Sequence, residues 1–389
     1  MIILTAKDYL GLLKDKDKNM KNTQKSIAFF GSSLVSAYWN GAATYYRGMI
    51  KALHALGHKI TFYEPDILSR QEFRDIPDPE WCEVKIYQPK EEELRNCLEE
   101  AAEADIIIKA SGIGVFDEWL ESSIHELKTK DNLILFWDVD APATLDRIHN
   151  NANDAFLDSI SRFDFILTYG GGPKVVEHYQ LAGANKCIPI YNALDPSTHF
   201  RVKEKEKFSG DLGFLGNRLP DREKRVDEFF VRAAKDLPSH QFLIGGSGWD
   251  NKLLPPNVRN LGHVFTKDHN AFNCSAKMIL NISRDSMASY GYSPATRIFE
   301  AAGAGACMIT DYWEGIEQFF EPGEEIFVAK SGGEVANLVK NITTEEARAI
   351  GRNAYKKVIE QHTYRQRAEQ FQEVVEKWKK NNLVSLSKN

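Results

Sequence analysis

The sequence predicts an α/β protein of two domains, each built on a parallel sheet with helices on both faces. The chain has 389 residues, which exceeds one typical domain and suits two domains of about 150–200 residues each. Short, continuously apolar segments recur along it, as expected of strands that are buried on both faces. Longer amphipathic segments separate them, and this alternation is typical of parallel sheets with right-handed crossovers.

In the first half of the chain, five short apolar segments are predicted to be buried strands. They are residues 26–30, 59–63, 105–109, 133–137 and 165–168. Segments such as 42–56 and 91–104 have the pattern of helices. The polar, charge-rich stretch 195–210 that follows has the composition of an interdomain linker.

The same rhythm restarts after this linker. The predicted strands are 212–215, 241–244, 277–282, 307–310 and 325–328, and the predicted helices are 219–235, 294–304, 333–341 and the long stretch 343–380. We therefore expect an N-terminal extension over 1–25, Rossmann-like domains over 26–200 and 201–375, and a tail over 376–389. Two such domains place a ligand site between them, at the carboxyl ends of the strands.

Composition narrows the class of protein. Hydrophobic residues make up 43% and charged residues 27%, which is ordinary for a globular protein. A net charge of −6 argues against a broad basic face for nucleic acid, although a local basic patch is compatible with it. The sequence has no apolar stretch of the roughly 18–20 residues that a membrane helix needs. The first residues do not read as a signal peptide, and the five cysteines form no C-x-x-C pair, so we expect a cytoplasmic protein.

An aromatic and polar cluster follows the first predicted strand. Tyr38, Trp39, Asn40 and Gly41 lead from it into a helix. Small residues let a ligand approach the backbone, and a helix N-terminus favours anions, so we predict a loop that contacts ligand. The alternative is an ordinary turn between strand and helix. The glycine spacing is not G-x-G-x-x-G, which disfavours a dehydrogenase.

Two carboxylates, Asp138 and Asp140, come directly after the predicted strand 133–137. At the carboxyl end of a strand they would face the ligand site, and close contact between them could hold one protonated. We predict that they act in catalysis or acceptor binding, with Asp140 the first candidate and Asp138 the second. The alternative for Asp140 is helix capping, because Ala141 and Pro142 follow it.

A run of three glycines centred on Gly171 follows the predicted strand 165–168 and opens a helix. Such a run permits close approach of the backbone to a ligand or to the other domain. A purely structural turn is an equal alternative.

In the second half, three charged residues are candidates for ligand binding. Arg218 follows the first strand of this half, where a guanidinium can hold a diphosphate in bidentate fashion. Arg297 and Glu300 share one face of a short predicted helix. Arg297 could bind phosphate, and Glu300 could accept hydrogen bonds from ribose hydroxyls. The alternative for Arg297 and Glu300 is a local ion pair on a solvated helix. Arg222 and Lys224, which follow Arg218, are expected to be solvated surface residues.

The stretch 293–311, continued by 315–317 and 321–325, resembles the C-terminal domain of CgeB-like glycosyltransferases, a family named after a spore maturation protein. Residues 38–48 and 191–196 resemble that family too, so the likeness runs from about residue 26 to 375. The resemblance implies the GT-B fold. In that fold two Rossmann-like domains face each other across a cleft, and the C-terminal helices pack back toward the N-terminal domain.

The resemblance implies transfer of a sugar, with a hexose expected, from a nucleotide-diphosphate-sugar to an acceptor that the sequence does not identify. A nucleic acid is among the possible acceptors. The resemblance also implies that no metal ion or other cofactor is required. Glu300 matches the acidic residue that holds the donor ribose, and Arg218 and Arg297 match diphosphate-binding positions. Backbone contact with the nucleobase is implied for Gly262, His263 and Val264.

One position departs from the pattern of the related large retaining family. Tyr292 stands where that family has a Glu near the sugar, so the stereochemical outcome stays open. Tyr292 and Ser293 are still predicted to contact the donor, and Gly171 and Asn192 to line the cleft with the 38–41 loop. Two alternatives share the architecture: a nucleotide-sugar epimerase and a non-catalytic nucleotide-sugar-binding protein.

Overall fold

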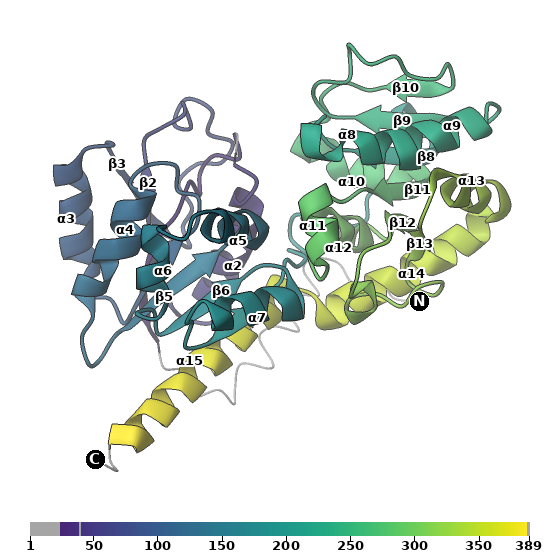
Figure 1. The fold of residues 1–389 in the computed structure, drawn as a ribbon. Helices are drawn as coiled ribbons and strands as arrows, with labels where there is room; N and C mark the ends of the chain where they lie inside the picture. The colour runs from purple at the N-terminus through teal and green to yellow at the C-terminus, as the bar shows by residue number, and fades with distance from the viewer. Residues whose placement is uncertain (1–23, 39, 387–389) are drawn as a thin grey trace. The chain divides into compact units, whose positions relative to one another are not determined.

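The computed structural model describes residues 24–38 and 40–386, which form two compact units (Figure 1). The first unit takes its described residues from Met1–Tyr169, Val176–Ile190 and Tyr364–Asn389. The second unit consists of Gly170–Val175 and Tyr191–Thr363. The units are therefore not two successive halves of the chain. Most of the predicted N-terminal extension, and Trp39, lie outside the described residues.

The first unit is built on a seven-stranded parallel sheet with the strand order β3-β2-β1-β4-β5-β6-β7. Its central strands are buried along their whole length, which accounts for their continuous apolar sequences. The strands are β1 Ser26–Phe30, β2 Lys59–Pro65, β3 Glu83–Tyr87, β4 Ile106–Ala110, β5 Leu133–Asp138, β6 Phe165–Thr168 and β7 Cys187–Pro189.

Seven α-helices of the described chain accompany this sheet. They are α2 Ala43–Ala55, α3 Glu91–Ala101, α4 Asp117–Ser123, α5 Ala141–Asn150, α6 Ala155–Ile160, α7 Gly172–Leu181 and α15 Tyr364–Leu386. Helix α15 comes from the end of the chain and packs against α2. A Cβ at Gly48 would lie 2.2 Å from the Tyr364 ring, so the glycine allows this close approach. The prediction that C-terminal helices pack back onto the N-terminal domain is confirmed for α15.

The second unit has a six-stranded parallel sheet with the order β10-β9-β8-β11-β12-β13. Its strands are β8 Gly210–Leu215, β9 Phe242–Gly245, β10 Val258–Asn260, β11 Ala276–Asn281, β12 Met308–Asp311 and β13 Phe327–Ala329. Its helices are α8 Pro220–Val226, α9 Arg232–Asp236, α10 Thr266–Ser275, α11 Asp285–Tyr290, α12 Thr296–Gly303, α13 Gly332–Asn341 and α14 Thr344–Gln361. In both sheets the strand order reverses beside the first strand, where parallel α/β sheets bind ligands.

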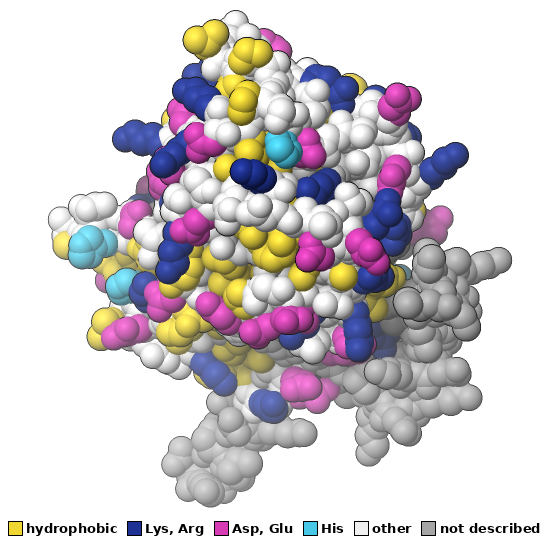
Figure 2. Space-filling model, turned by 90° about the vertical axis from the view of Figure 1, so that its right-hand side faces the viewer, with side chains coloured by type: hydrophobic (Ala, Val, Ile, Leu, Met, Phe, Trp, Pro, Cys, Tyr) yellow, Lys and Arg dark blue, Asp and Glu magenta, His cyan; other side chains and the backbone are white. Residues whose placement is uncertain are grey.

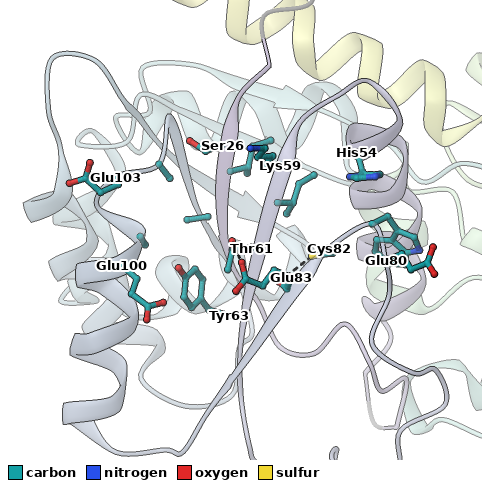
Figure 3. Close-up of a pocket in the computed structure, with 16 residues that line it drawn as sticks. Ser26, His54, Lys59, Thr61, Tyr63, Glu80, Cys82, Glu83, Glu100 and Glu103 are labelled. Atoms are coloured by element: carbon teal, nitrogen blue, oxygen red, sulfur yellow. Dashed lines mark hydrogen bonds between the residues drawn. The ribbon is translucent and has the colours of Figure 1, made fainter.

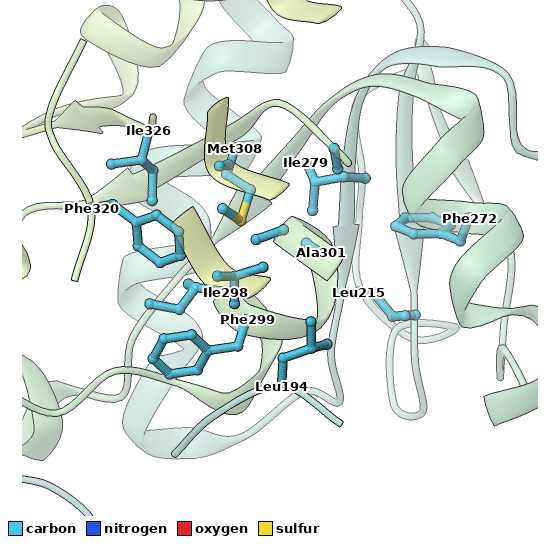
Figure 4. Packing of buried hydrophobic residues seen from close by; sticks show 14 of the residues in the cluster. Leu194, Leu215, Phe272, Ile279, Ile298, Phe299, Ala301, Met308, Phe320 and Ile326 are labelled. Atoms are coloured by element: carbon cyan, nitrogen blue, oxygen red, sulfur yellow. The ribbon is translucent and has the colours of Figure 1, made fainter. Parts of the chain in front are cut away.

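Helix α12 lies at the centre of a hydrophobic core in the second unit (Figure 4). Ile298, Phe299 and Ala301 are fully buried there. They pack with Ile279, Met308, Phe320 and Leu194, among other residues. Because these residues turn one side of α12 into the core, Arg297 and Glu300 are left only partly buried.

All of the predicted strands are present, with ends shifted by a few residues, and three further strands were not predicted. The additional strands β3, β7 and β10 each lie at an edge of a sheet. Edge strands are half exposed, so polar residues such as Glu83 and Lys85 interrupt their apolar pattern. The predicted helix 219–235 contains a π-helical turn at Asp227–Val231, and the stretch 343–380 divides into α14 and α15.

A buried charge network fixes the loop after β4. The Lys109 ammonium is fully buried and lies 2.7 Å from Asp117 and 2.8 Å from Glu121. Asp117 also accepts hydrogen bonds from the backbone amides of Ile113 and Gly114. Burial alone would raise the pKa of Asp117, but the charge of Lys109 and these amides outweigh it and lower that pKa. The network therefore ties the loop to α4.

We expect Lys109→Ala to reduce the free energy of unfolding of the first unit by about 3–5 kcal/mol, because two carboxylates would be left without their buried cation. Chemical denaturation of the purified protein measures this loss. Lys377→Ala is the control, since Lys377 forms only an exposed pair with Glu373 and its removal should change stability little. Equal stability of the two variants would contradict a structural role for the Lys109 network.

Candidate functional site

Two loops at the carboxyl edge of the second sheet form one continuous surface. A Cβ at Gly246, whose φ is +127°, would lie 2.3 Å from the carbonyl oxygen of Gly216. The Arg218 amide donates to the Ser247 carbonyl at 2.9 Å. The Trp249 indole donates to the Gly216 carbonyl at 2.7 Å. The loops that follow β8 and β9 are therefore held tightly against each other.

Two arginines meet beside this surface. The guanidinium carbons of Arg222 and Arg297 lie 5.5 and 5.8 Å from the centre of the Phe214 ring. Arg222 donates to the Asn217 carbonyl at 2.5 Å, while its buried Nε has no hydrogen-bond partner. Within the described part of the chain, neither guanidinium forms an ion pair with a carboxylate.

Carboxylates compensate the charge of this pair only from a distance, Glu300 acting on Arg297 and Asp221 and Asp311 acting on Arg222. Burial lowers the pKa of Arg222 to about 10, and the charge of Arg297 contributes to that lowering. Burial also lowers the pKa of Arg297. Two like charges at a partly desolvated site raise the free energy of the unliganded protein, and an anion between them would relieve it. The arrangement is therefore suited to bind a phosphate or diphosphate.

Arg218, the residue predicted to hold the diphosphate, is engaged elsewhere. Its guanidinium forms two hydrogen bonds to Glu223, at 3.0 and 2.6 Å, and Lys252 reaches the same carboxylate at 2.9 Å. The hydrogen bonds from Arg218 and Lys252 lower the pKa of Glu223 to about 2. The expectation that Arg222 is solvated surface is wrong, because only 8% of that residue is exposed.

The predicted ribose and nucleobase residues lie on neighbouring elements of this unit. Glu300 projects from α12, and one of its oxygens lies 3.7 Å from Nε2 of His199. Gly262 has a φ of +63° with open space where a Cβ would stand, and His263 is exposed. Val264 is buried, and its carbonyl oxygen lies 3.1 Å from Nε2 of His269.

Tyr292 is held in a strained conformation among glycines. Its φ is +45°, which is unusual for a residue with a side chain. A Cβ at Gly172 or at Gly315 would lie 2.4 or 2.3 Å from its ring. The Gly171 amide donates to the Tyr292 carbonyl at 2.8 Å, and the adjacent Ser293 is buried. The glycine run is thus required structurally, because it lets the chain pack onto Tyr292.

Asn192 is buried and fixes the start of α12. Its side-chain amide donates to the Pro294 carbonyl at 3.3 Å and accepts from the Thr296 hydroxyl at 3.1 Å. The predicted ligand-lining residue therefore makes hydrogen bonds that position the helix carrying Arg297 and Glu300.

In the first unit, Asp138 is the centre of a buried hydrogen-bond cluster. Its carboxylate accepts from the hydroxyls of Ser111 at 2.8 Å, Thr144 at 3.1 Å and Tyr179 at 2.5 Å, and from the Asp140 amide at 3.0 Å. Burial raises the pKa of Asp138, although these hydrogen bonds oppose the rise. The geometry fits a residue that organises the ends of β4, β5 and α7.

Asp140 occupies the N-cap position of α5, with φ −150° and ψ 61°. Its side chain accepts no capping hydrogen bond from the helix. Capping therefore does not account for this residue. It remains partly exposed at the carboxyl edge of the sheet, where an acceptor group could reach it.

The loop after β1 is held by its own side chains. Tyr38 stacks on Phe73 with ring centres 4.1 Å apart. Asn40 is buried, donates to the Ser33 carbonyl at 2.7 Å and accepts from Ser32 at 2.9 Å. Gly41 has no atom within 4 Å of the position where a Cβ would stand, so a side chain could fit there.

The two described cavities lie at the opposite edges of the sheets from these residues. One, of about 430 Å³, opens beside the first residues of β1 and β2 and has an acidic rim that includes Glu80, Glu100 and Glu103 (Figure 3). The other, of about 580 Å³, adjoins the starts of β8 and β11. On the face shown in Figure 2, basic and acidic side chains are interspersed.

Two further searches covered the described residues. No group of three or more His, Cys, Asp or Glu side chains there has a metal-binding arrangement. None of the helices there combines the length and apolarity needed to cross a membrane.

Solved structures of similar fold cover nearly the whole chain. HepE of Anabaena in complex with UDP-glucose superposes with a TM-score of 0.64 at 12% identity, covering 91% of this chain and 100% of HepE. Sucrose-phosphate synthase from Thermosynechococcus elongatus gives 0.67 at 14% identity, covering 91% and 99%. The chain has the GT-B fold. AviGT4, a glycosyltransferase of avilamycin A biosynthesis, gives 0.58 at 14% identity, covering 92% and 98%.

The sequence itself matches a known family over part of its length. Residues 222–373 match the family described as glycosyl transferase-like. This stretch contains Arg222, Arg297 and Glu300. The residues of the candidate site therefore lie within the part of the chain that matches the family. The match and the fold together confirm the predicted glycosyltransferase class. No curated protein matches the chain.

We expect Gly172→Ala to destabilise the second unit by about 1–3 kcal/mol. The added methyl group would collide with the Tyr292 ring, and the φ of +48° at residue 172 is unfavourable for alanine. Gly41→Ala is the matched control and should leave stability nearly unchanged. Thermal unfolding of both variants measures the difference. A Gly172→Ala variant as stable as the Gly41→Ala variant would show that the packing on Tyr292 is not tight.

Proposed function

We propose that the protein transfers a hexosyl group from a uridine diphosphate sugar and that the second unit binds this donor. The main supporting observation is the pair Arg222 and Arg297. Arg222 is buried and Arg297 partly buried, and neither forms an ion pair in the described chain. The glycosyl transferase-like match over residues 222–373 and the UDP-glucose complex of HepE support the class of donor. The motif in 293–325 favours the CgeB-like group within this class.

The chemistry follows from where charge develops. The bond between the anomeric carbon and the diphosphate oxygen breaks, and the departing diphosphate takes the electron pair. Arg222 and Arg297 are already oriented beside Phe214, so they stabilise this charge without reorganisation. We propose that they take the place of a divalent cation. Glu300 would accept hydrogen bonds from the donor ribose.

The bond that forms joins the anomeric carbon to an oxygen or nitrogen of the acceptor, whose proton must be removed. Asp140, partly exposed at the carboxyl edge of the first sheet, is the proposed base if the transfer inverts the anomeric centre. If transfer retains the centre, Asp140 would instead position the acceptor or stabilise the positive sugar. Asp138 would act by holding the loop that carries Asp140.

The cysteines agree with a cytosolic location. All five are free thiols, and Cys82, Cys97, Cys187 and Cys307 are buried. Burial raises the pKa of each of these four, so they behave as unreactive core residues. Reduced cysteines are typical of cytosolic proteins.

We expect Arg222→Ala and Arg297→Ala each to lower the affinity for UDP by about tenfold or more, because a charge-assisted hydrogen bond contributes roughly 1.5–3 kcal/mol. Arg218→Ala is the matched control and should have a smaller effect, since Arg218 is paired with Glu223. Calorimetric titration in the presence of a chelator measures all three. Unchanged affinity in folded Arg222 and Arg297 variants, or loss of wild-type turnover on chelation, would contradict the proposal.

We expect Asp140→Asn to slow the release of UDP and sugar from the donor by roughly 10²-fold if Asp140 is the base, with donor affinity preserved. Water serves as the acceptor in this assay, which avoids the need to identify the natural one. A near-wild-type rate would remove Asp140 from catalysis. Conversion of the donor to its epimer without release of UDP would instead identify an epimerase.

A further inference from the structure

The cavity beside the starts of β8 and β11 has a basic lining. It has a volume of about 580 Å³, and its lining residues all belong to the second unit. Glu204 is the single carboxylate among the described residues that line it, against four cationic side chains. The cations are those of Arg201, Lys203, Lys277 and Arg348. A cavity of this size can enclose a small metabolite, and the excess of cations favours an anionic one.

Two of the cations come from the charge-rich stretch that has the composition of a linker. The Lys205 amide in this stretch donates to the Ser275 hydroxyl at 2.8 Å, which holds the stretch against the end of α10. Within the described part of the chain, neither Arg201 nor Lys203 forms an ion pair. Their charges are therefore available to a ligand in the cavity.

The other two cations have weak partners. The Lys277 ammonium donates to the Val339 carbonyl at 2.8 Å, and Glu346 acts on it only from a distance. The Arg348 guanidinium lies 3.7 Å from Glu204, and both side chains of this pair are exposed. An exposed ion pair contributes little stability, so a ligand can compete with Glu204 for the guanidinium.

Asn273 adds a polar group that the described protein leaves unused. It lies on α10, lines the same cavity and is only 4% exposed. Its buried side-chain carbonyl oxygen has no hydrogen-bond partner. Leaving a buried polar group unpaired is unfavourable, and a hydroxyl group, which both donates and accepts, complements a side-chain amide. The lining therefore suits a ligand that carries a hydroxyl as well as a negative charge.

Cys274 lies next to Asn273 in the chain and can report whether the cavity is occupied. All five cysteines are among the described residues, and only Cys274 is partly exposed. Its sulfur accepts from the Val202 amide at 3.4 Å and lies 3.5 Å from the Ala304 carbonyl oxygen. Burial raises the pKa of the thiol, and the Val202 amide and the charge of Arg201 oppose that rise. A ligand in the cavity would cover this thiol.

We propose that this cavity is a second ligand site, which binds a small organic phosphate that carries hydroxyl groups. The basic lining would hold the phosphate, and Asn273 would bind a hydroxyl. A phosphate monoester carries up to two negative charges, which suits this lining better than a single carboxylate does. The site goes beyond the proposed sugar transfer, because it lies at the opposite edge of the second sheet from Arg222 and Arg297.

The test follows the rate at which a thiol reagent labels Cys274 in the folded protein, at constant ionic strength. Glucose 6-phosphate is the probe, and glucose and inorganic phosphate are its separate parts. Saturating glucose 6-phosphate should slow labelling of the wild type by about tenfold or more, because only the unliganded fraction reacts. Glucose should not slow it, and inorganic phosphate should do so only at a higher concentration.

Variants locate the bound probe. The Arg201→Ala/Lys203→Ala variant should bind glucose 6-phosphate about tenfold more weakly, because it lacks two charge-assisted contacts. Asn273→Leu has a similar volume and should fold, but it should bind glucose 6-phosphate no better than inorganic phosphate. Lys235→Ala/Lys340→Ala is the control of equal net charge. It removes two exposed cations of the same unit that do not line the cavity, and it should bind as the wild type does.

Three results would overturn the site. The first is unchanged labelling of the wild type in glucose 6-phosphate. The second is equal affinity for inorganic phosphate and glucose 6-phosphate, which would show that no hydroxyl is recognised. The third is protection that survives in Arg201→Ala/Lys203→Ala but disappears in Arg222→Ala/Arg297→Ala, which would place the probe at the donor residues instead.

Discussion

Two guanidinium groups that lie beside one aromatic ring, and form no ion pair in the described part of the chain, are the constraint around which the second unit is arranged. The position of Arg222 depends on a residue without a side chain, because a Cβ at Gly216 would lie 2.9 Å from its guanidinium. Nearby cations are treated differently: Arg225 forms an ion pair with buried Asp311, and Arg284 forms one with Asp221. Of these four arginines, only Arg222 and Arg297 form no ion pair in the described chain, and a diphosphate would supply one for both.

The first unit uses buried polar groups for another purpose. Asp138 and Lys109 are both fully buried, and each is surrounded by partners that satisfy it. Asp138 joins the ends of three elements, and Lys109 ties the loop after β4 to α4 through Asp117 and Glu121. These networks hold the carboxyl edge of the sheet in place, and Asp140 lies at that edge with its side chain only partly buried. Precise placement of such a group is what a transfer reaction requires.

The sequence predicted the central strands and the two-domain α/β class because both faces of a central parallel strand are buried, which leaves a continuous apolar pattern. Edge strands such as β3 lack that pattern. Which arginine is left without an ion pair could not be predicted from the order of residues. Arg218 comes first after the strand, yet it is paired with Glu223, while Arg222 in the first turn of α8 reaches back over the strand end. Pro220, which starts that helix, was the available signal.

The remaining site residues depend on tertiary contacts. His199 lies in a charge-rich stretch that has the composition of a linker, and only packing through Gly303 shows that it meets Glu300. Likewise, Asp138 and Asp140 are indistinguishable by type, and burial separates their roles.

The central claim is that Arg222 and Arg297 form an anion site of their own. Thermal unfolding with inorganic pyrophosphate tests it most directly, since a ligand that binds the folded state raises the midpoint by mass action. The account predicts a rise for the wild type that vanishes in the Arg222→Ala/Arg297→Ala double variant, and an equal rise in both proteins would contradict it.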